Sequence, residues 1–470
     1  METTPMVVFI TVICCFSTLS TSVLAGEATC PMQPSSLDGA ILHVGGSGPG
    51  NFTIVQDAID NATANDTIFI YSASSPYNQI FNVTKPLHII GEDKDTTIFL
   101  GRNFTMADEY VIKVQAPFVT IAELTIENSR TGINPNQHGR FTNLLFSDVM
   151  LPLYLSGSSN NTIDDNLFVN QKTSSENDGI YMYHANDNLI ANNTMHFNGD
   201  HVVVGIHLAY GFRNTISDNT LFNCSIDAWQ NDYTRNTFVG NTINGKTFVC
   251  LVNVSDTTVV DAAQVVLANC HHVTVTNITF MKQQLGVFIA NSHACAVTGC
   301  TFDQNYQAIL VASSDNTTLF FNTIRNILPS RGLNGYSVGI CLSGDTDTSV
   351  SRNSIVNNSV GLYLEYCNGT MVSHNRFRNN QGFLKMMYID SAGGVFVREG
   401  SRNSVMANNF IGNRPQASFV SGTTSWLNNY WGRPKIHPRP ILGMKYTGLW
   451  ILPHFTIQYD RRPALFPNSA

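Results

Sequence analysis

A phrase of about 20 residues recurs through the interior of the chain and limits the fold more than any other feature. The phrase usually begins with Gly and ends near Asn, as in GIYMYHANDNLIANNTMHFN from Gly179 and GLYLEYCNGTMVSHNRFRNN from Gly361. Equivalent positions of neighbouring phrases lie 22 residues apart at four places, 219 and 241, 278 and 300, 300 and 322, and 353 and 375. A period of this length, made of short alternating strands, predicts one coil of a parallel β-helix.

Alternation within the phrase assigns side chains to the inside of the coil. The positions expected to face inward are Ile180, Met182, Ile206, Leu208, Val287, Ile289, Leu362 and Leu364. Leucine-rich repeats have a similar period, but their L-x-x-L-x-L frame is missing, and frequent Asn, Gly and Thr with no 3.6-residue period argue against helical repeats. Asn recurs at the turns, where it tolerates a left-handed backbone and its amide can bond to the coils above and below. We interpret these Asn residues as structural.

We therefore predict an all-β protein, a single-stranded right-handed parallel β-helix of about ten to twelve coils. A short N-terminal helix with an apolar stripe from Val55 to Ala62 is expected to cap the stack, with Thr53 to Gln56 as its capping box. Residues 36–425 are predicted to form the β-helix with this cap. Residues 426–470, rich in Pro and aromatics, are predicted to form a C-terminal cap or tail. That segment carries six Lys or Arg against Asp460 alone, so docking on an anionic surface is an alternative.

The N-terminal residues indicate export. Residues 6–25 read MVVFITVICCFSTLSTSVLA, an apolar run that ends in small residues and predicts a signal peptide over 1–25. An uncleaved membrane anchor is the alternative, because 20 residues are long enough to span a bilayer. We expect no transmembrane segment after the signal peptide and a secreted, extracellular or cell-surface location, equivalent to a periplasm. The formal charge of −7 argues against a nucleic-acid partner.

Thirteen N-x-S/T sequons are candidate glycosylation sites of a glycoprotein, although an Asn- and Thr-rich repeat also produces sequons by chance. They are Asn51, Asn61, Asn65, Asn82, Asn103, Asn160, Asn192, Asn223, Asn253, Asn277, Asn316, Asn357 and Asn368. The cysteines form no CxxC motif, and the sequence assigns no disulfide pairs.

Two groups of residues on the early coils are the candidates for function. Aromatic side chains on the outer face of a first strand suit the C–H faces of sugar rings, and the predicted ligand-binding set is Tyr154, Tyr181, Tyr183, His207 and Trp229. The predicted catalytic set, which supposes acid–base chemistry on a glycosidic bond, is Asp165, Asp218, Asp200 and His201. Asp165 and Asp218 are the predicted pair of carboxylates, because they occupy equivalent positions two coils apart. Asp164, Asp178 and Asp227 lie near them in sequence as further acid or base candidates. Packing under a loop is the alternative for the aromatics, and Asp in place of turn Asn is the alternative for the carboxylates.

The stretch ILHVGGSGPGNFTIVQDAIDNATANDTIFIYSA and the segment Leu87–Gly101 resemble the N-terminal cap and first coils of pectin-lyase-like right-handed β-helix proteins. With the NNTI-type coils and the NNYWG segment at 428–432, the chain is most similar to NosD-type β-helix repeat proteins, also described as carbohydrate-binding and sugar-hydrolysis repeat domains. Many proteins of this type are secreted by methanogenic archaea. The resemblance spans about residues 40 to 432 and implies a fold more strongly than an activity.

The catalytic signatures of pectin methylesterases, polygalacturonases, pectate lyases and alginate epimerases are missing. No motif requires a cofactor, and calcium or copper remain open. The NosD resemblance implies copper, for which one loose donor group is His196, His201 and His207 with Met182 and Met195, and another is Cys270 with His271 and His272.

The expected function is binding of an extracellular polysaccharide or a cell-envelope glycan. The alternatives are a polysaccharide lyase or hydrolase that uses Asp and His on the early coils, a structural envelope glycoprotein, and a NosD-like copper-maturation protein. Catalysis is not implied by any motif in the sequence.

Overall fold

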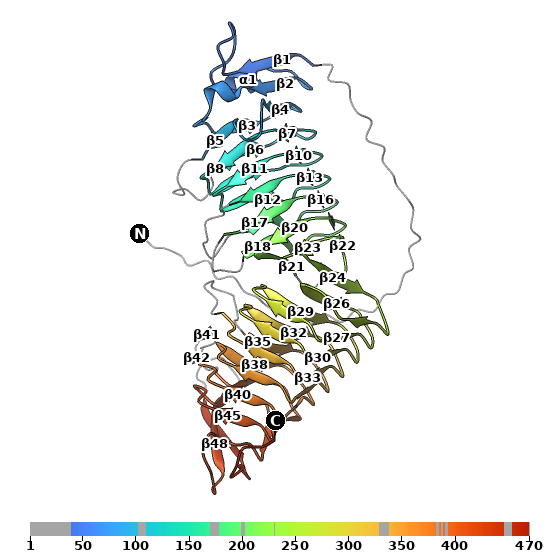
Figure 1. The fold of residues 1–470 in the computed structure, drawn as a ribbon, viewed down its shortest axis with the longest axis vertical. Coiled ribbons are helices and arrows are strands. Elements are labelled where there is room, and N and C mark those ends of the chain that lie inside the picture. The colour runs from blue at the N-terminus through green and yellow to red at the C-terminus, as the bar shows by residue number, and fades with distance from the viewer. Residues whose placement is uncertain are drawn as a thin grey trace. The chain divides into compact units, whose positions relative to one another are not determined.

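A computed structural model describes residues 39–101, 110–169, 178–198, 203–229, 231–328, 338–381, 385–386, 389–390, 393–445 and 454–469 of the chain. Residues 39–470 form one compact unit. Its strands follow one another as successive coils in sequence order (Figure 1). Each coil turns through up to three short strands, and each strand pairs in parallel with its equivalent in the next coil. The predicted all-β right-handed parallel β-helix is confirmed.

The coils form two consecutive stacks, and three parallel sheets, numbered I to III, run through each. The bounds of the strands of the first stack follow, sheet by sheet. Sheet I holds β3 (Phe81–Val83), β6 (Tyr110–Val114), β9 (Thr131–Asn134), β12 (Leu151–Ser156), β15 (Asp178–Tyr183), β18 (Val203–Ala209) and β21 (Cys224–Ala228). Sheet II holds β1 (Ile41–Val44), β2 (Thr67–Ile70), β4 (His88–Gly91), β7 (Thr120–Ala122), β10 (Arg140–Thr142), β13 (Thr162–Asp164), β16 (Leu189–Ala191), β19 (Thr215–Ser217) and β22 (Thr237–Val239). Sheet III holds β5 (Ile98–Leu100), β8 (Thr125–Glu127), β11 (Leu145–Ser147), β14 (Leu167–Val169), β17 (Thr194–His196), β20 (Thr220–Phe222) and β23 (Thr242–Ile243).

The second stack repeats this order. Its sheet I holds β24 (Lys246–Val252), β26 (Gln264–Ala268), β29 (Leu285–Ala290), β32 (Gln307–Ala312), β35 (Val338–Ser343), β38 (Val360–Glu365), β43 (Val395–Arg398), β46 (Ala417–Val420) and β48 (Arg439–Lys445). Its sheet II holds β25 (Thr258–Val259), β27 (Thr274–Thr276), β30 (Ala296–Thr298), β33 (Thr318–Phe320), β36 (Ser349–Ser351), β39 (Met371–Ser373), β44 (Asn403–Met406), β47 (Thr424–Leu427) and β49 (His454–Asp460). Its sheet III holds β28 (Thr279–Met281), β31 (Thr301–Asp303), β34 (Thr323–Arg325), β37 (Ser354–Val356), β40 (Arg376–Arg378) and β45 (Asn409–Ile411). A separate antiparallel pair joins β41 (Lys385–Met386) and β42 (Ile389–Asp390).

The stacks meet where β23 turns back into β24 and pairs with it in antiparallel fashion. Sheet I of the first stack ends at β21, and β24 pairs with β26 rather than with β21. The side-chain amide of Gln264 donates to the carbonyl oxygen of Ile226 at 2.8 Å and links the two stacks. Phe288, on the outer face of β29, is buried in the same apolar cluster as the interior of the first stack. The outer face of the second stack therefore closes the end of the first.

Apolar side chains fill each stack, and the predicted inward positions Ile180, Met182, Ile206, Leu208, Val287, Ile289, Leu362 and Leu364 are all fully buried. Gly361 begins its phrase because a Cβ there would lie 2.5 Å from the carbonyl oxygen of Gly394 in the next coil. Any larger residue would push these coils apart.

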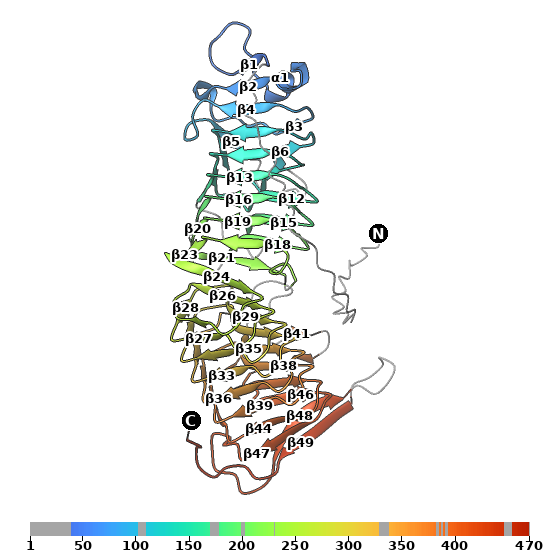
Figure 2. The ribbon, with the colours of Figure 1, turned by 90° about the vertical axis from the view of Figure 1, so that its right-hand side faces the viewer.

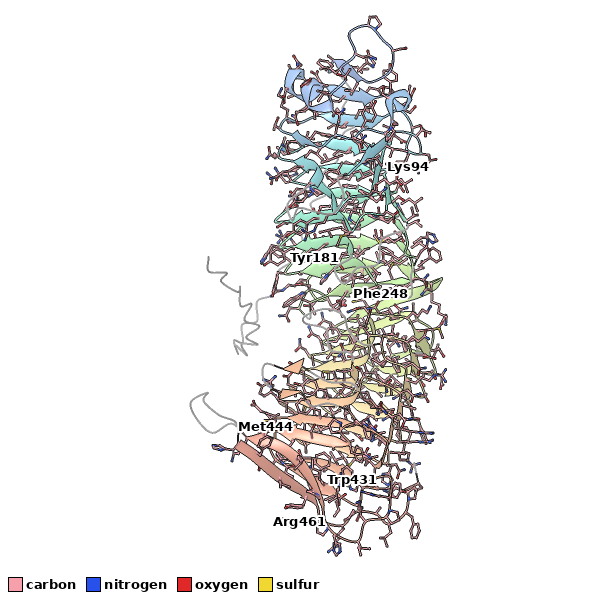
Figure 3. The ribbon with its side chains drawn as sticks, turned by 90° about the vertical axis from the view of Figure 1, so that its left-hand side faces the viewer. Lys94, Tyr181, Phe248, Trp431, Met444 and Arg461 are labelled. Atoms are coloured by element: carbon pink, nitrogen blue, oxygen red, sulfur yellow. The ribbon has the colours of Figure 1, made fainter. Side chains whose placement is uncertain are left out.

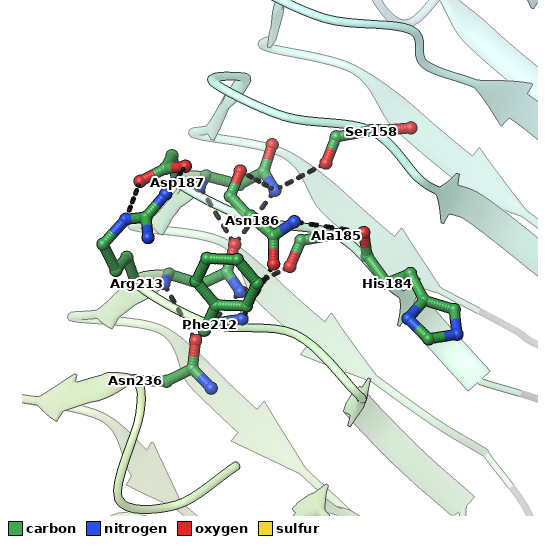
Figure 4. Close-up of polar contacts among 10 residues, drawn as sticks. Ser158, His184, Ala185, Asn186, Asp187, Phe212, Arg213 and Asn236 are labelled. Atoms are coloured by element: carbon green, nitrogen blue, oxygen red, sulfur yellow. Dashed lines mark hydrogen bonds and ion pairs between the residues drawn. The ribbon is translucent and has the colours of Figure 1, made fainter.

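Buried Asn residues at equivalent turns form ladders that join successive coils, as the sequence predicts. The side-chain oxygen of Asn214 accepts both the backbone N–H and the side-chain amide of Asn188, at 3.0 and 2.9 Å. The same pattern joins Asn193 to Asn219 and Asn353 to Asn375. On the outside of the turn, Arg213 forms an ion pair with Asp187 of the preceding coil at 2.6 Å (Figure 4).

Exposed turn positions account for most sequons. Twelve of the thirteen fall in the described residues, and Asn103 lies outside them. Eight of these twelve adopt a left-handed backbone, which Asn tolerates better than most residues. These eight are Asn65, Asn160, Asn192, Asn223, Asn253, Asn277, Asn316 and Asn357. Turn geometry thus explains why Asn recurs there, whether or not a glycan is attached.

The N-terminal cap contains the predicted short helix, α1 (Val55–Asn61), followed by a 3-10 turn over Ser72–Ser74. The predicted capping box is wrong. Ile54 is the N-cap residue and no side chain caps the helix, because the backbone N–H of Val55 bonds instead to the side-chain oxygen of Gln79 at 2.8 Å. No described helix is long and apolar enough to cross a bilayer. The seven described cysteines, Cys224, Cys250, Cys270, Cys295, Cys300, Cys341 and Cys367, are free thiols.

Candidate functional site

Three of the predicted ligand-binding residues form a row on the outer face of sheet I in the first stack. Strand register places Tyr154 of β12 beside Tyr181 of β15, and Tyr181 beside His207 of β18. The Tyr154 and Tyr181 rings stack with centroids 5.6 Å apart, and those of Tyr181 and His207 lie 4.9 Å apart. Figure 3 labels Tyr181 on this face. Parallel pairing makes such a row because equivalent outward positions repeat about every 4.8 Å.

The other two predicted aromatics belong to a second group beside this row. The ring centroids of Tyr183 and Tyr181 lie 6.3 Å apart, and the Tyr210 ring packs edge-on against Tyr183 with centroids 5.9 Å apart. Trp229 packs on Tyr210 with ring centroids 4.5 Å apart and does not continue the row of Tyr154, Tyr181 and His207. The register partner of His207 is Asp227, because Trp229 follows the end of β21. Tyr210 also stacks on His184 with ring centroids 5.1 Å apart. Tyr210 and Trp229 are nevertheless each 42% exposed, so part of each ring is open to a ligand.

Carboxylates surround His207. An Asp178 oxygen lies 3.0 Å from Nδ1 of His207, and both side chains are mostly buried. Asp227 lies beside His207 on the next strand and 3.5 Å from the hydroxyl of Tyr233. Asp232 accepts the backbone N–H of Tyr210 at 2.7 Å. The aromatic side chains and three carboxylates therefore converge on one end of the face.

These neighbours change the acidity of several groups. Burial alone would lower the pKa of His207, but the hydrogen bond and charge of Asp178, with the charges of Asp227 and Asp232, raise it above its ordinary value. Burial raises the pKa of Asp227 despite the opposing charge of His207. Burial also raises the pKa of Asp232, and burial beside Asp178 raises that of Tyr181 to about 12. The site thus favours a protonated imidazole near the carboxyls of Asp227 and Asp232, which hold their protons more tightly than usual.

A pocket of 310 Å³ adjoins this cluster at the junction of the two stacks. Asp227 and Ala228 of the first stack form one wall. The other wall comes from the outer face of sheet I of the second stack, and it includes Gln284, Gln307 and Ser343 with the apolar Phe288 and Leu310. Asp227 therefore belongs both to the row on the face and to the pocket at its end.

The predicted catalytic pair lies elsewhere. Asp165 and Asp218 are exposed at the turns between sheets II and III, each with a left-handed backbone, and Asn192 occupies the same position in the coil between them. The pair is two coils apart, as predicted, which corresponds to about 10 Å. This turn is not next to the aromatic face on sheet I, whereas the further candidates Asp178 and Asp227 lie beside His207 on that face. Asp200 and His201 lie outside the described residues.

Three members of the cluster were not predicted: Tyr210, Asp232 and Tyr233. Tyr210 follows β18 and has the left-handed backbone of a turn residue, and the other two lie in the turn after β21. The repeat phrase gives no signal for such turns, because they are not copied from coil to coil. A sequence signal does exist in the string DAWQNDY at 227–233, which gathers four aromatic and acidic side chains just before the repeat is interrupted.

Two family models match the chain in overlapping stretches. Residues 249–448 match the model described as periplasmic copper-binding protein (NosD), and residues 110–262 match the model of the right-handed β-helix region. By these matches, residues 249–448 are similar to NosD proteins, and residues 110–262 are similar to right-handed β-helix regions in general. A search of curated proteins gives no match.

Several solved structures are similar to the chain over most of its length, at low sequence identity and low TM-scores. The A-module of mannuronan C-5 epimerase AlgE6 from Azotobacter vinelandii is 11% identical, covers 79% of this chain and 94% of its own, and has a TM-score of 0.32. The catalytic domain of a GH87 α-1,3-glucanase in complex with nigerose is 12% identical, covers 86% and 71%, and has a TM-score of 0.31. Alginate lyase from Paenibacillus sp. str. FPU-7 is 12% identical, covers 70% and 93%, and has a TM-score of 0.26.

The copper donors suggested by the resemblance do not converge. Met182 and Met195 are fully buried inside the first stack, whereas His207 is on its outer face and His196 stacks on Phe222 on another sheet. Cys270 is buried with its sulfur directed at the Leu251 carbonyl. Across the described residues, no group of three or more His, Cys, Asp or Glu is arranged to hold a metal ion. The described residues thus do not fit a copper centre.

Proposed function

We propose that the chain is an extracytoplasmic β-helix repeat protein that binds polysaccharide on the outer face of sheet I of the first stack. One observation carries the proposal: the exposed rings of Tyr210 and Trp229 lie beside the carboxylates Asp178, Asp227 and Asp232 and next to a pocket. A pyranose presents an apolar C–H face and a rim of hydroxyl donors. Aromatic rings match the face, and carboxylates accept hydrogen bonds from the rim.

The charges of this site favour a neutral glycan over a polyuronate. Three carboxylates face the site. The basic side chains next to them are His207, His184, which stacks on Tyr210, and Arg235, whose charge opposes the rise in the pKa of Asp232. The His207 imidazole is already paired with Asp178, whose carboxylate oxygen lies 3.0 Å from Nδ1 of the ring. A uronate carboxylate placed here would meet three carboxylates against these bases, of which Arg235 is the one Arg, and this excess of like charge weakens binding.

Location outside the cytoplasm rests on two supports. The predicted signal peptide over residues 1–25 lies outside the described residues, and the NosD family model describes periplasmic proteins. Exposed turn Asn residues would also be reachable by a glycosylating enzyme. A secreted chain whose intact mass begins at Gly26 would support this part of the proposal. Retention of the chain in the cytoplasm would contradict it, and an intact Met1 on exported protein would identify the uncleaved anchor instead.

The test is retention of the purified chain on a panel of neutral and uronate polysaccharides. We expect a neutral polymer to retain the wild type, and Trp229→Ala or Tyr210→Ala to weaken binding about tenfold, since loss of ring stacking is worth about 1 to 1.5 kcal/mol. Tyr366→Ala is the matched control, because Tyr366 is 45% exposed but lies at a turn of the second stack. Retention that survives both site variants would refute the site. No retention on any polymer would favour a structural envelope protein.

A second candidate function, glycoside hydrolysis, has one specific observation in its favour. Asp178 and Asp227 flank His207, since an Asp178 oxygen lies 3.0 Å from its ring nitrogen and Asp227 is in register with it on the next strand. Inverting enzymes likewise place a carboxyl group on each side of the reacting bond. The raised pKa of Asp227 suits a general acid that gives its proton to the leaving glycosidic oxygen. Asp178 would accept a proton from the water that attacks the anomeric carbon. New reducing ends that disappear in Asp227→Asn would assign this activity, and retention without new reducing ends would leave binding alone.

A further inference from the structure

The two C-terminal strands present an apolar face that is exposed over most of its area, and Met444 at one end of it packs against a buried cluster that includes Phe396 and Val420. Strands β48 and β49 form an antiparallel hairpin, with Pro440 opposite Tyr459, Leu442 opposite Ile457 and Met444 opposite Phe455. These six side chains share one face of the hairpin because opposite residues point to the same side. Leu442 is 64% exposed and Phe455 84% exposed. Figure 2 shows the hairpin at the C-terminal end of the second stack.

The other face of the hairpin holds it against the last coil. Ile441 is buried, and a Cβ on Gly443 would lie within 2.6 Å of three atoms of Phe419. Nε1 of Trp426 donates to the side-chain oxygen of Gln458 at 2.8 Å. Asp460 is buried and accepts from the side chains of Asn429 and Trp431 at 3.1 Å. The apolar face is therefore presented by an anchored hairpin, with its outward direction set by these contacts.

Positive charges flank the hairpin. Arg439 and Lys445 stand at the two ends of β48, on the side opposite Leu442 because strand side chains alternate, while Arg461 and Arg462 follow β49 and Arg433 and Lys435 precede β48. Loss of hydration, together with the charges of Arg433 and Arg439, lowers the pKa of Lys435, which shows that these three cations lie close together. Within the described residues, no ion pair joins any of the six cations to a carboxylate. Asp460, the sole acidic residue after position 430, is buried.

We infer that the β48–β49 hairpin docks on a lipid bilayer whose surface carries anionic headgroups. Leu442, Ile457 and Phe455 would enter the headgroup–acyl boundary, while the flanking Arg and Lys residues contact the headgroups. A purely electrostatic ligand such as an acidic glycan would leave the apolar face in water. A second copy of the hairpin would bring like charges together at close range. The bilayer is the partner that matches both the apolar face and the basic residues that flank the hairpin.

This inference is independent of the glycan site, which is on a different stack. The test is co-sedimentation of the full chain with vesicles of phosphatidylcholine, alone or with about one quarter phosphatidylglycerol. We expect binding to the anionic vesicles and at least about fivefold weaker binding at about 0.5 M salt than at about 0.05 M. Leu442→Ser with Phe455→Ser, and separately Arg439→Gln with Lys445→Gln, should each reduce binding at least about tenfold. Val260→Ser is the matched control, since Val260 is 64% exposed at a distant turn of the second stack.

A second measurement keeps the test decisive if a variant folds poorly. The variant Leu442→Cys, labelled with an environment-sensitive fluorophore, should brighten on anionic vesicles, and the same label on Val260→Cys should not. Three results would overturn the inference. They are absence of wild-type binding to anionic vesicles, equal loss of binding in the Val260 control, and concentration-dependent dimerisation that Leu442→Ser abolishes while vesicle binding is absent. The last result would identify a second copy of the chain as the partner.

Discussion

Replacing Asp345 with Asn is expected to make the protein more stable, by an amount that grows with pH. Asp345 is fully buried at the turn after β35. One of its carboxyl oxygens accepts the backbone N–H of Ser314 at 2.8 Å, and the other has no donor near it. Residues at the same turn position donate to the carbonyl two residues earlier, as Ser314 does to Ala312 at 3.1 Å and Cys367 to Glu365 at 3.3 Å. A protonated Asp345 can do the same, which an ionised one cannot.

The magnitude follows from the pKa. Burial raises the pKa of Asp345 from its ordinary value of 3.8 to about 8, even though the hydrogen bond from Ser314 lowers it. Between these values the unfolded chain releases the proton and the folded chain retains it, so unfolding becomes easier as pH rises. The stability that Asp345 contributes is fully present below pH 3.8 and is lost as pH rises towards about 8. Four pKa units correspond to at most about 5 to 6 kcal/mol. Asn keeps the acceptor and supplies an N–H without this pH dependence.

The assay is denaturant unfolding of wild type and Asp345→Asn at several pH values, with the difference in unfolding free energy taken at each pH. Other titrating groups cancel in this difference, which should rise by several kcal/mol between pH 4 and pH 8 and then level off. Asp347→Asn is the control, because Asp347 is exposed two residues further along the same turn. A difference that stays constant across this range would refute the reasoning, since it would mean that Asp345 is ionised in the folded protein.

Two further predictions concern the ladder and the site. Asn353→Ala should lower the unfolding free energy by about 2 to 4 kcal/mol, because it removes the acceptor of two Asn322 N–H bonds and the donor to the Leu319 carbonyl. Asn357→Ala, at an exposed turn, should lower it by about 1 kcal/mol. Denaturant midpoints check both, and equal losses would contradict a special role for the ladder. Protonated His207 stabilises the fold, because its pKa is raised above the ordinary imidazole value of 6.5. This stabilisation is fully present below pH 6.5 and is lost as pH rises through the raised pKa. His207→Asn removes it, so wild type and variant should have equal unfolding free energies in alkaline buffer. Unfolding at acid and alkaline pH measures this, and a gap that widens with pH would show the sign to be wrong.

The parts of the fold that repeat could be predicted from the sequence. Alternating apolar residues such as Ile180 and Met182 set the inside of the coil, and the Asn at each turn marks the ladder. Both signals are strong because the same physical requirement recurs in every coil: a buried apolar face and a satisfied turn. Tyr154, Tyr181 and His207 followed from the same alternation, since outward positions in register must form a row.

The parts that do not repeat escaped prediction. The antiparallel return from β23 to β24 breaks the coil. Its one sequence signal is a spacing of 37 residues between the equivalent positions Asn241 and Ile278, where several other neighbouring phrases are 22 residues apart. Thr53 has the residue type of an N-cap, yet Gln79, from a segment 26 residues away in sequence, supplies the hydrogen bond to the helix. Local residue type predicted the helix but not the tertiary contact that replaced its cap.

The interruption of the repeat is also what creates a concave site. In an unbroken β-helix, sheet I would continue from β21 into the next strand, and Asp227 would be one more position in a flat outward row. Here sheet I ends at β21, and the outer face of the next stack, with Phe288, Gln284 and Gln307, lies against it. Because that face closes the first stack, Asp227 is partly removed from water and its pKa rises. The polar cluster thus acquires its burial and its pocket from the junction, so the most informative residues for function are those that depart from the repeat.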